Sequence, residues 1–181
     1  MTNRNLSSSL ELFIFDGGDI LGKVILICGK IGSGKTTYAN KLAKQINAVN
    51  ISQDELMLNL FGAGLYYSEP KKYEEYCSKV EDYVKRKAGE AAKAGAIVIC
   101  ENGFWSRSER DELRKRYSDM EVKCELHYID TSEKQRLQNI KCRNEEIQQG
   151  KSHFYLTNDN DIYHFFETPD DCEVDVRVKM G

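Results

Sequence analysis

Short apolar segments recur along the chain, and each ends at glycine or at polar residues. They cover residues 24–29, 49–52, 96–102 and 123–130. Segments of this length suit strands buried on both faces, as in a parallel sheet. Residues 173–179 alternate apolar and charged side chains, which is typical of a strand with one buried face. The pattern therefore predicts five strands.

Apolar side chains repeat at every third or fourth position in the segments between these strands. One such helical face lies in residues 39–46, and a longer one covers residues 73–88, with a predicted stop at Gly95. A serine followed three residues later by glutamate or glutamine marks two more helix starts, at Ser106 and Ser132. Strands that alternate with helices predict an α/β fold, with three α/β/α layers around a mostly parallel five-stranded sheet.

The chain is expected to form one domain, residues 23–181, preceded by an extension at residues 1–22. The extension contains an apolar run at residues 12–15 that we predict as an added edge strand. A further short helix is expected to begin at Thr157. The length of 181 residues, with 40% apolar and 30% charged residues, is typical of a single globular domain.

Net charge and cysteine content argue against several classes of protein. The net charge is −3, so binding to bulk duplex nucleic acid is not expected. The six cysteines are scattered and form no CxxC pair, so neither a zinc site nor a disulfide framework is indicated. The start of the chain is polar, and no apolar run is long enough to cross a bilayer. We therefore expect a reduced, cytoplasmic protein with no membrane partner.

The segment GKIGSGKT, residues 29–36, matches the phosphate-binding motif G-x-x-x-x-G-K-[ST] at every defined position. It lies between a predicted buried strand and a predicted helix, which is the context that this motif requires. Its glycines let backbone N–H groups approach phosphate oxygens, Lys35 would reach the terminal phosphates, and the Thr36 hydroxyl would bind Mg²⁺. The glycine spacing excludes the dinucleotide motif G-x-G-x-x-G. We therefore predict a site for ATP and Mg²⁺ formed by Gly29, Lys30, Ile31, Gly32, Ser33, Gly34, Lys35, Thr36 and Thr37.

Two acids follow predicted strands and are expected at the same crevice as this loop. Asp54 comes after the strand at 49–52, and Glu101 lies at the end of the run at 96–102. We predict that Asp54 orients or deprotonates the acceptor of a phosphoryl group and that Glu101 holds Mg²⁺ through water. Two alternatives stay open: Asp54 as a helix N-cap, and Glu101 as a purely structural acid.

Arg136 and Arg143 lie seven residues apart on one predicted helix. Seven residues make almost two turns, so both side chains are expected on the same face. Arginine can stabilise the charge on a transferring phosphoryl group. We predict that residues 131–156 form a lid that carries both arginines into the site as catalytic groups. The alternative is a solvated helix face whose charges pair with one another.

Four segments together resemble a known family: GKIGSGKTTYANKLA, NISQDEL, ICENGFWSRSERDELR and RLQNIKCRN. They look like the small P-loop kinases of the zeta-toxin, chloramphenicol phosphotransferase and polynucleotide kinase type, over residues 23–167. The resemblance implies a P-loop NTPase fold with a five-stranded parallel core, and ATP with Mg²⁺ as the cofactors. It also implies a catalytic aspartate that matches Asp54, and an arginine-bearing lid that matches Arg136 and Arg143.

The same resemblance shows a difference on the acceptor side. Polynucleotide kinases carry an arginine three residues after the aspartate, where this chain has Met57, so a polynucleotide 5′ end is not the favoured acceptor. We predict acceptor contacts from Asn102, Trp105 and Arg107. For Trp105, packing inside the protein is an equal alternative. Arg107 and Arg110 are expected first as surface charges of a helix and second as acceptor contacts.

These residues predict a kinase that transfers the γ-phosphate of ATP to a hydroxyl of a small-molecule or nucleotide-type acceptor. Two other classes stay open: a regulatory P-loop NTPase and a nucleotide-binding module without catalysis. The sequence lacks the N-K-x-D motif of GTPase switches, and it keeps both Lys35 and Asp54. Both observations favour the kinase.

Overall fold

The computed structural model describes residues 22–152, 156 and 165–180. In chain order its elements are β1 (Lys23–Cys28), α1 (Lys35–Ile46), β2 (Val49–Ser52), α2 (Gln53–Phe61), α3 (Gly64–Ser68), α4 (Pro70–Lys93), β3 (Ile97–Gly103), α5 (Arg107–Asp119), β4 (Lys123–Thr131), α6 (Glu133–Gln148) and β5 (Val176–Met180). The five predicted strands are confirmed. The apolar run at 12–15 and the helix expected at Thr157 lie outside the described residues.

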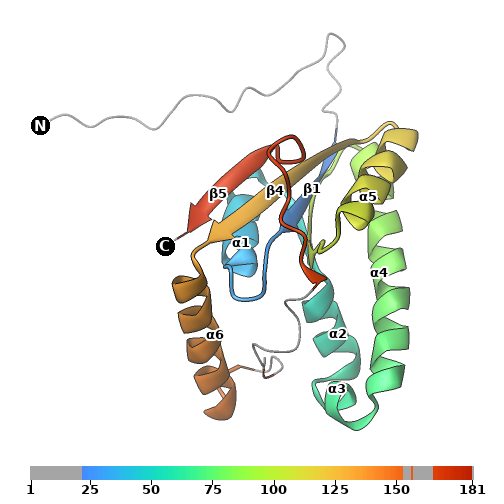
Figure 1. Ribbon diagram of the computed structural model, residues 1–181. Coiled ribbons are helices and arrows are strands. Elements are labelled where there is room, and N and C mark those ends of the chain that lie inside the picture. The colour runs from blue at the N-terminus through green and yellow to red at the C-terminus, as the bar shows by residue number, and fades with distance from the viewer. Residues whose placement is uncertain (1–21, 153–155, 157–164, 181) are drawn as a thin grey trace, which may run out of the picture.

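The strands form one sheet in the order β2-β3-β1-β4-β5, and every neighbouring pair is parallel. Helices connect the strands on both sides of this sheet, which confirms the predicted three-layer fold (Figure 1). Because all strands run in one direction, their carboxyl ends meet at a single edge of the sheet. The loop after β1, the start of α2, the end of β3 and the start of α6 therefore lie at this edge (Figure 1).

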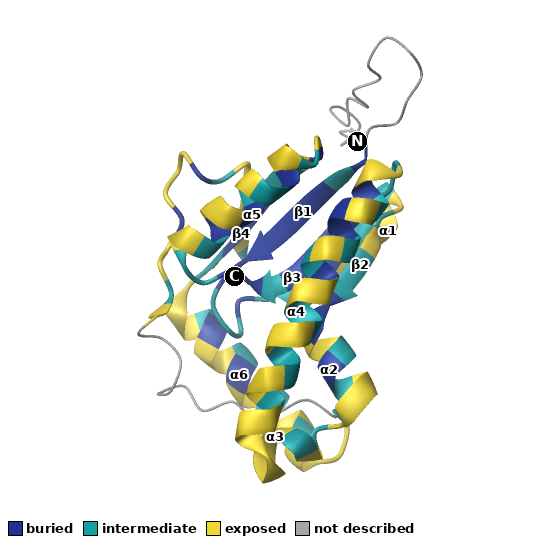
Figure 2. Cartoon of the chain, turned by 90° about the vertical axis from the view of Figure 1, so that its right-hand side faces the viewer, coloured by how far each residue is buried: buried dark blue, intermediate teal, exposed yellow. Residues whose placement is uncertain are grey.

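Each face of the sheet has its own apolar core. On one face α1 packs Ala39 against a row of isoleucines: Ile25, Ile27, Ile99 and Ile129. On the other face α4 and α5 pack against residues of β1, β3 and β4. Figure 2 shows that α4 is buried where it crosses the sheet, whereas its first half extends past the sheet beside α2 and α3. None of the described helices is long and apolar enough to span a membrane.

The sequence pattern does not predict α2 and α3. Helix α2 follows β2 without a loop, and α3 has only five residues, which is too short to display a helical period. Strand β5 begins at Val176, three residues later than predicted. The reason is that Glu173 and Asp175 use their side chains elsewhere: Glu173 pairs with Arg110, and Asp175 accepts a hydrogen bond from the Leu126 amide at 2.7 Å.

All six cysteines are free thiols. Cys28 and Cys100 are buried in β1 and β3, and burial raises the pKa of each thiol to about 12. Cys142 on α6 and Cys172 before β5 are exposed. Cys28 and Cys100 are therefore core side chains of the sheet.

Candidate functional site

The P-loop, residues 29–36, joins β1 to α1 at the carboxyl edge of the sheet. Gly32 and Gly34 have φ angles of 76° and 94°, in the left-handed region that favours glycine. Gly32 also lies so close to α6 that an added Cβ atom would lie 2.7 Å from Ile140 Cγ1. The loop leads directly into the N-terminus of α1, where backbone N–H groups and the helix dipole favour an anion such as phosphate.

Lys35 lies folded against the loop that carries it. Its Nζ atom donates hydrogen bonds to the carbonyl oxygens of Gly29 and Lys30, both at 3.0 Å. Desolvation lowers the pKa of the Lys35 ammonium, and the nearby carboxylates of Glu101 and Asp54 oppose that shift. The lysine that the motif assigns to the phosphates therefore shares the crevice with both predicted acids.

Glu101 lies at the end of β3 and contacts the first turn of α1. Its Oε1 accepts a short hydrogen bond from the Thr36 hydroxyl. The residue is 8% exposed, and its Oε2 has no hydrogen-bond partner in the structure. Burial raises the pKa of this carboxyl, against the hydrogen bond from Thr36 and the charge of Lys35. A buried carboxylate with one unsatisfied oxygen beside a threonine hydroxyl fits the oxygen donors that a hard cation prefers.

Within the part of the chain that the structure describes, no group of three or more His, Cys, Asp or Glu side chains could hold a metal ion. A cation held by protein alone is therefore not indicated there. Mg²⁺ commonly binds through one or two protein oxygens, with water and substrate phosphates as its other ligands. Thr36 and Glu101 fit that pattern.

Asp54 is the second residue of α2 and its side chain is exposed. The N-cap of this helix is Ser52, whose Oγ accepts a hydrogen bond from the Glu55 amide at 3.4 Å. The alternative that Asp54 is the helix cap is therefore wrong. Although the residue is exposed, the surrounding protein raises the pKa of its carboxyl by desolvation, and the positive charges of Lys35 and Arg143 oppose this shift. Asp54 is thus within the electrostatic reach of one cation of the P-loop and one of α6.

The end of β4 and helix α6 are hydrogen-bonded to the main chain of the P-loop. Side chains of the β4–α6 segment donate hydrogen bonds to the carbonyl oxygens of three successive loop residues: Arg136 Nη1 to Ile31 at 3.1 Å, Asn139 Nδ2 to Gly32 at 2.9 Å and Thr131 Oγ1 to Ser33 at 2.7 Å. We call these three donors the α6 bracket. Ser132 caps the helix as predicted, by accepting a hydrogen bond from the Gln135 amide.

The two arginines of α6 have different surroundings. Arg136 is 1% exposed; besides its bond to the P-loop, its Nε donates to Glu133 at 3.0 Å. Arg143 is half-buried two turns further along; desolvation lowers the pKa of its guanidinium, and the charge of Asp54 opposes that shift. The structure therefore brings Arg143 into the electrostatic field of Asp54, whereas Arg136 contacts the P-loop main chain.

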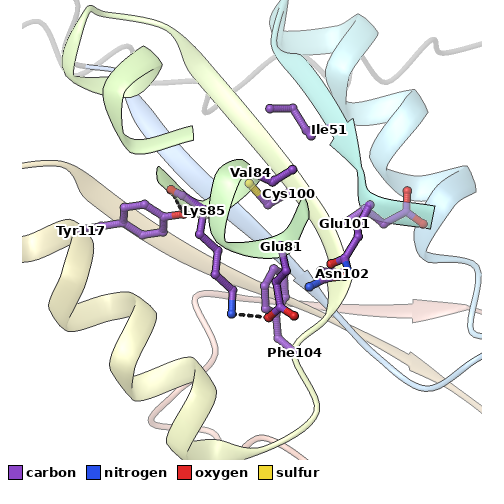
Figure 3. Close-up of a pocket in the computed structure, with 10 residues that line it drawn as sticks. Ile51, Glu81, Val84, Lys85, Cys100, Glu101, Asn102, Phe104 and Tyr117 are labelled. Carbon is purple, nitrogen blue, oxygen red and sulfur yellow. Dashed lines mark hydrogen bonds and ion pairs between the residues drawn. The ribbon is translucent and has the colours of Figure 1, made fainter. Parts of the chain in front are cut away.

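A small hollow lies between β3, α4 and the start of α2. It has a volume of about 10 Å³, which is room for roughly one water molecule. Figure 3 shows Asn102 pointing toward Glu81 of α4, while Glu101 points away from it. Lys85 lies in the same hollow and bonds to the carboxylate of Glu81, with Glu109 at 3.4 Å. Asn102, predicted from the sequence as an acceptor contact, lines this hollow.

Trp105 and Arg107 lie in or beside the loop between β3 and α5. The Trp105 indole packs over Gly103 so closely that a Cβ atom there would collide with it, and the residue is half-buried. Arg107 is exposed, and its guanidinium pairs with Asp170 at 2.7 Å. The Arg107 guanidinium is thus already paired with a carboxylate of this chain. Trp105 takes part in packing.

Arg110 is not the surface charge that the sequence indicates. It is 1% exposed and pairs with the buried carboxylate of Glu173 at 2.8 Å. It also donates hydrogen bonds to the carbonyl oxygens of Phe104, Trp105 and Glu167 at 3.1, 3.3 and 3.0 Å. Arg110 therefore fastens the loop after β3 to the chain segment that precedes β5.

Comparison with known proteins agrees with this geometry. Residues 24–156 match the family model AAA_33, described as an AAA domain, and this range covers most of the chain. The chain belongs to the AAA_33 family. This match confirms the predicted resemblance to small P-loop kinases with an ATP-binding motif.

Solved structures show the same fold as this AAA_33 protein. APS kinase CysC of Mycobacterium tuberculosis, in complex with AMPPNP and APS, has a TM-score of 0.61 at 19% identity, over 87% of this chain and 88% of the other. A gluconokinase of Sinorhizobium meliloti has a TM-score of 0.53 at 19% identity, over 89% and 83%. The PezAT toxin–antitoxin system of Streptococcus pneumoniae gives 0.59 at 16% identity, over 79% and 61%.

One curated relative is similar over part of the AAA_33 chain. The cytidylate kinase of Pyrobaculum islandicum is 38% identical over 77 residues, which is 42% of this chain and 42% of the relative. The match therefore spans less than half the length of that protein.

Sequence reasoning did not find three residues that support the site: Thr131, Asn139 and Arg110. Each acts on backbone far away in the sequence; Asn139, for example, is 107 residues from Gly32. A lone polar residue on a helix carries no local signal of such a contact. For Asn139, a hint was that the adjacent Ile140 belongs to the buried face of an otherwise polar helix.

Proposed function

We propose that this protein transfers the γ-phosphate of ATP to a hydroxyl group of a small-molecule or nucleotide-type acceptor. The observation that carries this proposal is that the charges of Lys35 of the P-loop and Arg143 of α6 both act on the Asp54 carboxylate, which does not cap its helix. A carboxylate at this position, with a pKa above its ordinary value, is suited to accept the proton of an attacking hydroxyl.

In the proposed reaction the acceptor oxygen forms a bond to the γ-phosphorus. The bond between that phosphorus and the β–γ bridging oxygen breaks, the hydroxyl proton moves to Asp54, and ADP leaves. Lys35 and the backbone amides of the P-loop compensate phosphate charge, and Arg143 stabilises the charge on the transferring group. Arg136 contributes through the conformation of the loop that it binds.

Thr36 and Glu101 are the residues that would hold Mg²⁺. Support comes from the unpartnered Oε2 of Glu101 and its contact with the Thr36 hydroxyl. Bound there, the ion would neutralise charge on the β and γ phosphates. The partial similarity to a cytidylate kinase raises a second candidate, in which the acceptor group is a phosphate rather than a hydroxyl.

The charges on the acceptor side favour the hydroxyl. A phosphate acceptor needs cationic side chains that clamp it. Among the described residues around β3, α4 and α5, the nearby cations are already paired with carboxylates: Lys85 with Glu81, Arg107 with Asp170 and Arg110 with Glu173. The position after Asp54 where polynucleotide kinases carry an arginine is Met57, which is buried.

The test is ADP release from ATP and Mg²⁺, with and without a panel of sugars, aminoglycosides, chloramphenicol, nucleosides, 5′-hydroxyl oligonucleotides and cytidine monophosphate. Asp54→Asn is compared with Glu55→Gln, a matched loss of one acid from the next position of the same helix turn. We expect acceptor-dependent release that falls at least a hundredfold in Asp54→Asn and stays unchanged in Glu55→Gln.

Three results would contradict the proposal, and each points to a different class. Release that ignores every acceptor and survives in Asp54→Asn indicates a regulatory NTPase. ATP binding with no release indicates a nucleotide-binding module. Release stimulated only by cytidine monophosphate and insensitive to Asp54→Asn indicates transfer to phosphate, because a phosphate acceptor needs no base.

A further inference from the structure

The α6 bracket controls which way the peptide groups of the P-loop face. A trans peptide bond is planar, so its N–H points opposite to its C=O. The Ile31 and Ser33 carbonyls bond to Arg136 and Thr131. The N–H groups of the residues that follow them, Gly32 and Gly34, are consequently directed away from the bracket, toward the side on which phosphate would bind.

The middle peptide of the turn is fixed at both ends. Its carbonyl, on Gly32, accepts the hydrogen bond from Asn139, and its N–H, on Ser33, donates to the carbonyl of Lys30 at 3.2 Å. A peptide that is held on both sides cannot rotate without breaking both bonds. Asn139 is therefore placed at the centre of the turn, between the two N–H groups that face the phosphate side.

A second contact fixes the orientation of the Asn139 amide. Gln135, one helical turn earlier, donates from Nε2 to Asn139 Oδ1 at 2.9 Å. With its oxygen occupied by Gln135, the asparagine presents its Nδ2 donor to Gly32. The turn is also in close packing contact with α6, because a Cβ atom at Gly32 would lie 2.8 Å from the Arg136 carbonyl oxygen.

We propose that Asn139, oriented by Gln135, is a positioning residue of the phosphate site and that α6 sets nucleotide affinity through it. The two residues hold the loop in its phosphate-accepting conformation before ATP arrives, so less ordering is needed on binding. This proposal rests on ATP binding by the P-loop and not on the identity of the acceptor.

The test is the Kd of ATP with Mg²⁺, measured by isothermal titration calorimetry without any acceptor. Asn139→Asp keeps the shape and the oxygen that Gln135 binds, but it turns the donor toward Gly32 into an acceptor. We expect its Kd to rise at least tenfold. Gln135→Leu leaves Asn139 in place and removes only its orientation, so we expect a smaller rise, of two- to fivefold.

The matched control is Gln138→Leu, because Gln138 is an exposed glutamine of the same helix whose amide bonds to Cys142. Its Kd should stay within twofold of the wild type. Thermal unfolding of all variants separates positioning from a structural role. The proposal is overturned if Asn139→Asp and Gln135→Leu bind ATP within twofold of the wild type, whatever their Tm.

A misfolded Asn139→Asp would leave Gln135→Leu as the deciding variant, with the same twofold limit. The proposed kinase activity fails independently: a protein that binds ATP but phosphorylates no acceptor would still show the rise in Kd. Loss of affinity only in proportion to loss of folded protein, seen as a reduced number of binding sites with unchanged Kd, also overturns the positioning role.

Discussion

Arg110→Met should be among the most destabilising single substitutions in the helices that cover the sheet. The Arg110 side chain is 1% exposed and donates two hydrogen bonds to Glu173, at 2.8 and 3.3 Å, and three to backbone carbonyls. Methionine fills a similar volume but leaves the buried Glu173 carboxylate without its cation, and of the described residues only the Asp170 amide still donates to it, at 3.0 Å. Breaking a buried pair in this way costs about 3–5 kcal/mol, which lowers Tm by roughly 2–4 °C per kcal/mol for a domain of this size.

The opposite substitution should cost less. In Glu173→Met the Arg110 guanidinium loses one partner but keeps the carbonyls of Phe104, Trp105 and Glu167 as acceptors. The double variant should be more stable than the sum of the two losses predicts, because an apolar pair leaves no buried charge. Arg116→Met on the same helix is the control, since Arg116 is half-exposed and its pair with Asp82 is worth at most about 1 kcal/mol.

Denaturant unfolding followed by tryptophan fluorescence measures these differences directly. The chain contains a single tryptophan, and it lies in the loop that Arg110 fastens. The pH dependence gives a second check. The Arg110 bond lowers the pKa of Glu173 below its ordinary 4.5, so the pair stabilises the protein above that value and the gain is lost as pH falls through the lowered pKa. A cost below about 1 kcal/mol for Arg110→Met at neutral pH, or no coupling with Glu173→Met, would refute this reasoning.

Three further predictions concern the site itself. Glu101→Gln should raise the free energy of unfolding of the ligand-free protein by about 1 kcal/mol, because burial disfavours the carboxylate. The same substitution should reduce ADP release with Mg²⁺ at least a hundredfold. A drop in stability would contradict the proposed cation site. Arg143→Ala should lower kcat more than it raises the Kd of ATP, as measured by coupled assay and titration. Unchanged turnover would show that Arg143 is only a charge on a solvated helix face. In the presence of an acceptor, kcat/KM should fall as pH drops through a pKa above the ordinary 3.8 of Asp54, and Asp54→Asn should flatten this limb of the profile.

The parts of the site that the sequence predicts are those with local signals. The P-loop is a contiguous motif, and Asp54 and Glu101 are found because each follows a recognisable strand in a parallel sheet. The cap of α2, by contrast, depends on where that helix begins: the sequence pattern offers Asp54, and the structure has Ser52. Only the structure decides between them.

The rest depends on pairs of residues that are distant along the chain. Arg110 reads as one charge in a polar helix, and its partner Glu173 lies 63 residues away. The seven-residue spacing of Arg136 and Arg143 correctly gives one helix. It does not show that the first arginine bonds to the P-loop main chain while the charge of Asp54 acts on the second. Periodicity predicts which face is buried and not which backbone atoms it meets.

Because some cysteines are buried and others exposed, their reaction with alkylating reagents can measure how the protein opens. At neutral pH the Cys28 and Cys100 thiols are protonated and shielded by the sheet, so an alkylating reagent reaches them only when the strands separate. Cys142 and Cys172 react in the folded protein because they are exposed. After the accessible thiols are blocked, alkylation of the two core cysteines measures the rate of global opening. A dye on Cys142 lies one residue from Arg143 and would follow the end of α6 when nucleotide binds.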